Sequence, residues 1–208
     1  NWPPATIANS QVDAVYLATV GGSLLKGPTG VAVDTDGNIY VSDSQNRRVQ
    51  KFSPDGDILA TWGSEGSGKG QFFIMNGIAV GGKGFVYVVG DSRVQVFTKD
   101  GRFIDMWGGA GGLWGAKGRF TGPMKITVDG AGNVYIADNT NLQKFSPDGK
   151  MLGFWPPPDG PSPDELKGID LSKPENNELR LRAISRPSPN GLAFDISGNI
   201  YVSESGGY

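Results

Sequence analysis

One sequence pattern recurs four times along this chain, and it restricts the folds that the chain can adopt. Each copy consists of a short apolar run, a turn that contains glycine, and a second apolar run that contains a tyrosine. The four tyrosines are Tyr40, Tyr87, Tyr135 and Tyr201, at intervals of 47, 48 and 66 residues. Repetition at such a period indicates similar structural units packed one against the next.

The first three copies also share a continuation. A phenylalanine precedes a turn with the sequence Asp-Gly, and a tryptophan stands ten positions after that phenylalanine. The pairs are Phe52 and Trp62, Phe97 and Trp107, and Phe145 and Trp155. The repeated tryptophan predicts packing between units, since a large aromatic side chain recurs at the same place in each.

Each unit contains four short alternating segments separated by turn residues. Glycine in these turns supplies the positive φ that tight hairpins require. Four antiparallel strands in roughly 45 residues are typical of a propeller blade. The chain is therefore predicted to be a single all-β propeller domain. Its blades are expected at about residues 27–63, 74–108 and 122–155, with a partial blade at 188–208.

The amino-acid sequence of the repeat resembles that of a known family. In the first copy the runs Gly30–Asp34, Gly37–Asp43 and Arg48–Phe52, followed by Trp62, resemble the NHL repeat. The resemblance covers residues 27–155 and part of the last copy. It implies an NHL-like β-propeller, a fold that serves protein- and RNA-binding modules, extracellular scaffolds and a few lyases. Because these functions differ, the resemblance implies the fold and leaves the function open.

The two ends of the repeat array are incomplete. The fourth copy stops after its second predicted strand, and residues 13–21 align with the fourth strand of the first unit. Two interpretations stay open: an incomplete ring extended by further blades from the same or another chain, or a four-bladed ring closed by the N-terminal strand. Unpaired blade edges need a partner or a shield. The proline-rich segment 156–187 is predicted to be an insertion.

The residue types that are missing exclude several kinds of chemistry. The 208 residues include no histidine and no cysteine. Thiolate nucleophiles, Ser-His-Asp catalysis and histidine-based transition-metal sites are therefore excluded within them. The net charge is −2 and no basic run exceeds Arg47-Arg48, so no nucleic-acid partner is expected.

No apolar stretch approaches the ~20 residues that cross a bilayer, so the chain is not expected to span a membrane. The chain begins with Asn1, which is consistent with removal of a signal peptide or with truncation. An extracytoplasmic location, secreted or periplasmic, is therefore expected.

Acidic residues recur at the end of the second strand of each unit. They are Asp43, Asp91, Asp138 and Glu204. They could form a ring of acceptors for a ligand or a cation, or each could shape its own loop through a bond to arginine or backbone. Because the acid is present in every unit, the second interpretation is favoured.

Asparagines stand before the innermost strand in two units, at Asn76 and Asn190. The run Pro189–Phe194 resembles calcium-dependent lactonases and strictosidine-synthase-like propellers, and in the lactonases an asparagine of this motif helps to hold a central divalent cation. The resemblance implies a possible Ca²⁺ site at these two asparagines. Calcium takes six to eight oxygens and no carboxylate accompanies the amides, so an asparagine that caps the turn is the favoured interpretation.

A binding surface is predicted where the sequence departs from the repeat. Trp114 lies in a glycine-rich loop between the second and third units, beside Lys117, Arg119 and Phe120. Arg47 and Lys69 are expected on the same face. Aromatic and arginine side chains are typical of interface hot spots, although Trp114 could also fold back onto its blade.

The sequence therefore favours a non-catalytic protein-interaction or assembly module. Its partner would be a protein, or further blades from the same or another chain. The alternative is a calcium-dependent lactonase-like hydrolase with a site at the channel mouth.

Overall fold

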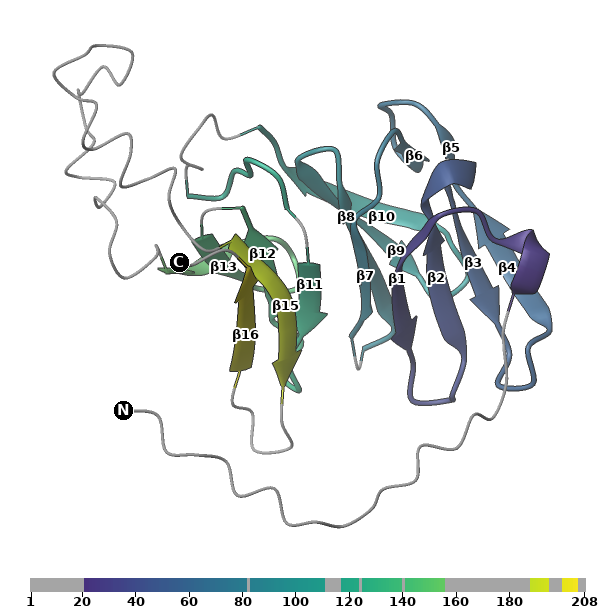
Figure 1. Cartoon of the computed structure of the whole chain (residues 1–208). Coiled ribbons are helices and arrows are strands. Elements are labelled where there is room, and N and C mark those ends of the chain that lie inside the picture. Colours follow the sequence, from purple (N-terminus) through teal and green to yellow (C-terminus); the bar gives the residue numbers. More distant parts are fainter. Residues whose placement is uncertain are drawn as a thin grey trace, which may run out of the picture.

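The computed structural model describes residues 21–81, 83–110, 117–123, 125–139, 141–155, 188–194 and 200–205. The described residues form three four-stranded antiparallel sheets and one two-stranded antiparallel sheet, which stand side by side (Figure 1). The first sheet, or first blade, comprises β1 (Pro28–Val33), β2 (Ile39–Asp43), β3 (Arg48–Phe52) and β4 (Ile58–Trp62). The second blade comprises β7 (Gly77–Val80), β8 (Phe85–Gly90), β9 (Arg93–Thr98) and β10 (Phe103–Gly108).

The third blade comprises β11 (Lys125–Val128), β12 (Val134–Asp138), β13 (Asn141–Phe145) and β14 (Met151–Trp155). The two-stranded sheet pairs β15 (Ser188–Phe194) with β16 (Ile200–Ser205). Three smaller elements complete the described part: the 3-10 turns η1 (Gly22–Leu24) and η2 (Ser44–Asn46), and a short parallel pair, β5 (Ser64–Glu65) with β6 (Gln71–Phe72).

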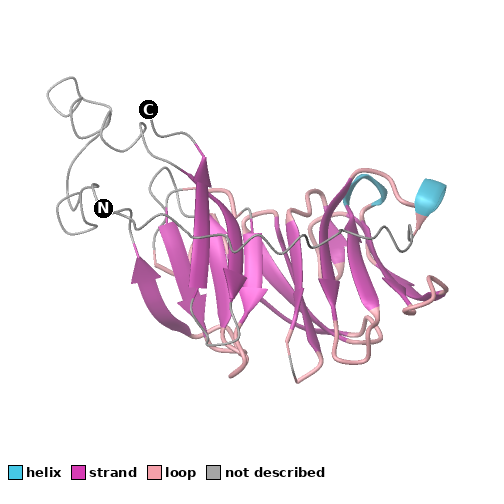
Figure 2. Ribbon diagram, turned by 60° about the horizontal axis from the view of Figure 1, so that its bottom comes forward, coloured by secondary structure: helices cyan, strands magenta, loops and turns pink. Residues whose placement is uncertain are grey.

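The first strand of each sheet carries the contacts between blades. β7 contacts both β1 and β11, and β15 contacts β11 on the far side of the third blade. The strand axes of successive blades have similar directions (Figure 2), and each blade packs one face on the next. The predicted orphan strand at 13–21 and the insertion at 156–187 lie outside the described residues.

Side chains that point alternately to the two faces of each sheet form an apolar layer between neighbouring blades. Between the first and second blades lie Tyr40, Val49, Ile78, Val86 and Phe97, all buried. A second layer of the same kind fills the space between the second and third blades. Successive strand residues point to opposite faces, so one blade contributes to both layers.

The repeated tryptophans close these layers at their outer side. The Trp62 ring lies 6.0 Å from that of Phe97, and Trp107 lies 4.5 Å from Phe145. Each indole also covers the glycine of the next blade's Asp-Gly turn: a Cβ added at Gly101 would come within 2.6 Å of Trp62. Packing between blades is thus confirmed for the first two tryptophans.

Trp155, the third tryptophan of the series, is 48% exposed. Within the described residues the two-stranded sheet beyond it supplies no third or fourth strand, and therefore no Asp-Gly turn to receive the indole. In the part of the chain that the structure describes, no helix is long and apolar enough to cross a bilayer.

Candidate functional site

All the turns between the second and third strands lie at one end of the blades, together with the connections from one blade to the next. This end is called the loop end and is uppermost in Figure 1. The opposite end carries the turns that join first to second and third to fourth strands, and is called the hairpin end. Of the predicted binding residues, Arg47, Lys69, Lys117 and Arg119 belong to the loop end.

Two of the recurring carboxylates hold the chain that enters the same blade. Asp43 accepts the backbone N–H of Lys26 at 2.6 Å, and Arg48 Nε binds its other oxygen at 2.8 Å. In the third blade Asp138 accepts the N–H groups of Thr121, at 2.9 Å, and Gly122, at 2.7 Å. Both carboxyl groups are completely buried.

Burial alone would raise the pKa of Asp43. The hydrogen bonds from Asn46, the Lys26 N–H and Arg48 outweigh this effect and hold the pKa below its usual value. These bonds favour the charged form, which therefore supports the loop. The carboxylates act on backbone and arginine, as the favoured interpretation of the repeat predicted. For Glu204 the side chain is not described.

In the second blade a carboxylate also holds the entering loop, but it stands one residue later in the chain. By strand register, the counterpart of Asp43 and Asp138 is Gly90, which pairs with Arg93. The acid has moved one residue on, to Asp91, in a two-residue turn in which Asp91 and Ser92 both have positive φ, 49° and 56°. This is the backbone of a type I′ hairpin.

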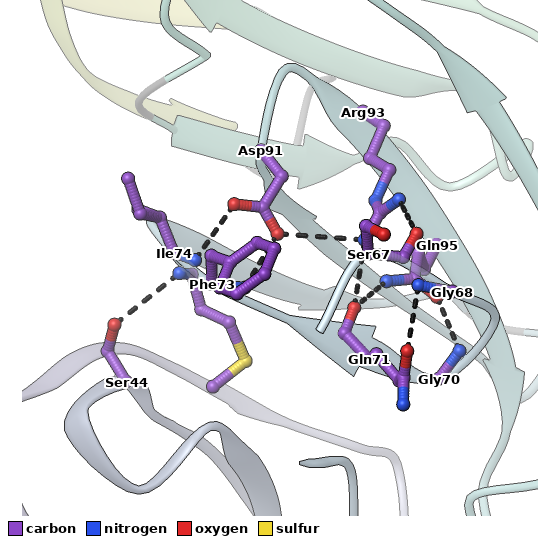
Figure 3. A network of polar contacts seen from close by, with 11 residues as sticks. Ser44, Ser67, Gly68, Gly70, Gln71, Phe73, Ile74, Asp91, Arg93 and Gln95 are labelled. Carbon is purple, nitrogen blue, oxygen red and sulfur yellow. Dashed lines mark hydrogen bonds and ion pairs between the residues drawn. The ribbon is translucent and has the colours of Figure 1, made fainter. Parts of the chain in front are cut away.

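From this turn, Asp91 accepts the N–H groups of Phe73 and Ile74, each at 2.9 Å (Figure 3). The neighbouring Arg93 forms an ion pair with Asp91 and donates to the carbonyls of Ser67 and Gln71. The loop that enters the second blade is therefore fixed from both sides.

Buried glutamines of the third strands hold the connections between blades. Gln95 accepts from the N–H of Gly70 at 2.8 Å and donates to the carbonyl of Gln71 at 2.7 Å (Figure 3). Gln143 forms the same pair of bonds in the third blade, with Gly118 N–H and Arg119 C=O. These amide contacts leave the loop-end backbone well anchored, so its exposed side chains have fixed attachment points.

The predicted cations lie along this anchored backbone. Arg47 follows η2 and its guanidinium donates to the carbonyl of Ser44 at 3.1 Å. Lys69 is exposed, with its ammonium 5.6 Å from the Phe103 ring. Lys117 and Arg119 are exposed at the third blade. Within the described part of the chain, none of these four forms an ion pair with a carboxylate.

The two aromatic residues of the predicted surface are not found among the exposed residues that the structure describes. Trp114 lies outside the described residues. Phe120 is fully buried and packs against Trp107 and Phe145, so the expectation that it belongs to a binding surface is wrong. The reason is that Phe120 repeats Phe72, which packs in the preceding layer.

The asparagines proposed for calcium serve the backbone where their contacts are described. Asn76 Nδ2 donates to the carbonyl of Pro123 at 2.9 Å and so joins the second blade to the third. Thr29 occupies the same place in the first blade and donates to Met75 C=O at 2.7 Å. Asn190 lies at a register shift of β15, and its side chain is not described. No group of three or more acidic residues that could hold a metal occurs among the described residues. The calcium site remains a prediction.

Sequence reasoning missed the largest departure from the repeat at the loop end. Phe73 and Ile74 are 47% and 54% exposed. The residues with the same hydrogen bonds to a carboxylate are Lys26 in the first blade, and Thr121 and Gly122 in the third. Comparing these positions between units would have revealed two large apolar side chains where the other blades have polar residues or glycine.

The hairpin end carries a different charge pattern. Asp34 accepts hydrogen bonds from the side chains of Asn38 and Tyr40, and Lys99 of the second blade lies 3.5 Å from it. Burial alone would raise the pKa of Asp34, but the bonds from Asn38, Tyr40 and the backbone outweigh burial and lower it from 3.8 to about 2. The turn therefore depends on an ionised carboxylate.

This pKa predicts an acid-sensitive contribution to stability. Because the folded-state pKa of Asp34 is depressed, its contribution is complete above about pH 4 and is lost as pH falls towards about 2. Between about pH 6 and about pH 3, urea unfolding of the unmodified chain should lose about 1 kcal/mol more than that of Asp34→Asn. An equal loss in both proteins would contradict this role of Asp34.

Four-stranded antiparallel blades that pack face to face through their innermost strands define a β-propeller. Residues 25–52 match the NHL repeat. The chain therefore has a β-propeller fold and contains an NHL repeat, as the repeated pattern predicted.

Comparisons with three known proteins show how far the similarity of sequence and fold extends. A stretch of 59 residues is 41% identical to the peptidyl-glycine alpha-amidating monooxygenase of Mus musculus, covering 26% of this chain and 6% of that protein. The fold is similar to a streptogramin B lyase (15% identity, TM-score 0.55), with 84% of this chain and 47% of that one covered. It is also similar to a gluconolactonase of Xanthomonas campestris (17% identity, TM-score 0.56), with 91% and 58% covered. The chain spans about half the length of these two solved structures.

Proposed function

We propose that this chain is a non-catalytic protein-interaction or assembly module that works through the exposed faces at the two ends of its blade array. The observation that carries the proposal is Trp155. The same residue of each preceding blade is covered by the next blade, whereas Trp155 is half exposed. A large aromatic side chain in this position favours a protein surface that completes the layer.

The first blade has a corresponding exposed face. Ala32 packs towards the second blade, so Val31 and Val33, which alternate with it, point to the other side of the sheet. They are 65% and 58% exposed. Both ends of the array therefore present apolar side chains of the kind that fill the layers between blades.

The polar groups at the loop end support an architectural role over a catalytic one. The carboxylates of Asp43, Asp91 and Asp138 bind loop backbone, and the Asn76 amide joins two blades. A group with such a task is poorly placed to exchange protons with a substrate, because its bonds would have to break at each turnover.

The proposal is tested by the mass of the purified chain in solution, measured by light scattering after size exclusion. We expect species above the 22.0 kDa of one chain, increasing with concentration. Trp155→Lys or Val31→Lys/Val33→Lys should shift the mass towards one chain, because each places a charge in an apolar contact.

Leu152→Lys is the matched control, because Leu152 is also about half exposed but lies at the register shift of β14. Its counterpart in the first blade, Leu59, stays exposed although a second blade follows. It should leave the mass distribution unchanged. A single 22.0 kDa species at all concentrations, unaffected by Trp155→Lys, would refute assembly through these faces.

A further inference from the structure

We infer that the loop end binds an acidic peptide segment through a patch formed by Phe73 and Ile74 with the cations Lys26 and Arg47. This surface is separate from the blade faces of the proposed assembly, so either idea can fail without the other. The patch is called the loop-end patch below.

Hydrogen bonds connect the segments that carry the four members of the loop-end patch. The η2 turn, which Arg47 follows, is bound to the backbone of Lys26 through Gln45 N–H, at 3.1 Å from the Lys26 oxygen. On its other side, the same turn uses the Ser44 hydroxyl to accept the N–H of Met75, the residue after Ile74 (Figure 3). The segments that carry the two cations and the two apolar residues are therefore neighbours at the loop end of the first two blades.

The apolar members are held in place although they are exposed. Asp91 binds both of their N–H groups, and Gly90 lets their backbone approach β8 closely. Their exposure is therefore a consequence of a fixed backbone, and little ordering would be needed before a ligand binds. Preorganised apolar side chains are effective anchors for a bound peptide.

The charge around the patch is positive. The acids of this end that could balance it, Asp43 and Asp91, are engaged with backbone and arginine. Among the described side chains of the loop end, Glu65 is the exposed acid. The cations that lack a carboxylate partner in the described residues extend along the whole end: Lys26, Arg47, Lys69, Lys117 and Arg119.

The chemistry of the ligand follows from this pairing. An exposed apolar anchor selects an apolar side chain, and a rim of unpaired cations selects carboxylates around it. A segment with one large apolar residue among Asp and Glu residues fits both requirements. A nucleic acid would satisfy the charge and could stack a base on Phe73, but it would leave Ile74 without an apolar partner.

The test uses fluorescence anisotropy with a labelled peptide in which one phenylalanine is flanked on each side by three glutamates. The whole chain should bind this probe, and added salt should weaken the complex because exposed charge pairs are screened. A peptide with serine in place of phenylalanine, and one with lysine in place of glutamate, should each bind about tenfold more weakly or not at all.

Phe73→Thr/Ile74→Gly is the decisive variant, since Thr121 and Gly122 show that the repeat accepts this pair with the same backbone bonds. We expect about tenfold weaker binding, and no change for Ile104→Thr, an exposed apolar residue of β10. Lys26→Gln should weaken binding by a few-fold, whereas Lys83→Gln, in the hairpin-end turn before β8, should not.

The inference fails if Phe73→Thr/Ile74→Gly binds the probe as tightly as the unmodified chain, or if no binding occurs at low salt. It also fails if a single-stranded oligonucleotide of equal charge binds more tightly than the probe. That result would assign the cations to a nucleic acid.

Discussion

Replacement of Gly90 by alanine is expected to lower the free energy of unfolding by about 3 kcal/mol, a large effect for the addition of one methyl group. The backbone of the loop that enters the second blade passes directly over this glycine. A Cβ at residue 90 would overlap the carbonyl oxygen of Ile74 and lie 2.9 Å from its carbonyl carbon. Because these are backbone atoms, the loop or β8 must move.

The effect of Gly90→Ala is measured by urea unfolding, with binding of the acidic probe as a second reading. Displacing the loop also displaces Phe73 and Ile74, so both stability and binding should fall. Gly130→Ala is the control, because a Cβ at that exposed turn meets nothing within 4 Å. If Gly90→Ala is as stable as Gly130→Ala, the close approach of the loop to β8 is wrong.

The second large effect is expected for Trp107→Ala, at about 3 kcal/mol or more. Its indole contacts the rings of Phe120 and Phe145 and covers Gly149 of the next blade, so truncation would leave a cavity between the second and third blades. The loss should appear in thermal and urea unfolding, together with faster hydrogen exchange in β13.

Trp155→Ala provides the comparison within the same repeat. Because Trp155 is about half exposed and no described blade covers it, its truncation should cost less than about 1 kcal/mol in dilute solution. The difference between the two variants reports what the next blade contributes. Equal losses would indicate that Trp155 is covered to the same extent as Trp107.

The sequence predicted the strands and their grouping because each blade is built from local signals. Hairpins depend on nearby turn residues, such as Gly37 with a φ of 81°, and alternation then decides which side chains face the next blade. The structural role of Asp43 and Asp138 was also predictable, because a requirement shared by every blade is architectural.

The features that were missed depend on contacts across the loop end. Sequence alignment matches Asp91 with Asp43, whereas strand register matches Gly90 with Asp43. The resulting one-residue shift changes how the entering loop is held. In the sequence, Phe73 is simply part of an apolar run after Phe72. The fold buries Phe72 and leaves Phe73 about half exposed, while Asp91 holds the backbone of Phe73.

The position of each tryptophan over the following blade's Asp-Gly turn gives the array a direction. The outermost strand of one blade is stabilised by its successor, since Trp62 rests on Gly101 and Trp107 on Gly149. The free energy of unfolding of the array is therefore approximately a sum of contributions from each blade and from each contact between neighbouring blades. Among the described residues, the third blade is followed by the two-stranded sheet alone, and no Asp-Gly turn covers Trp155. Hydrogen exchange should consequently be fastest at β14, and the second blade, which has a complete blade on each side, should be the most protected.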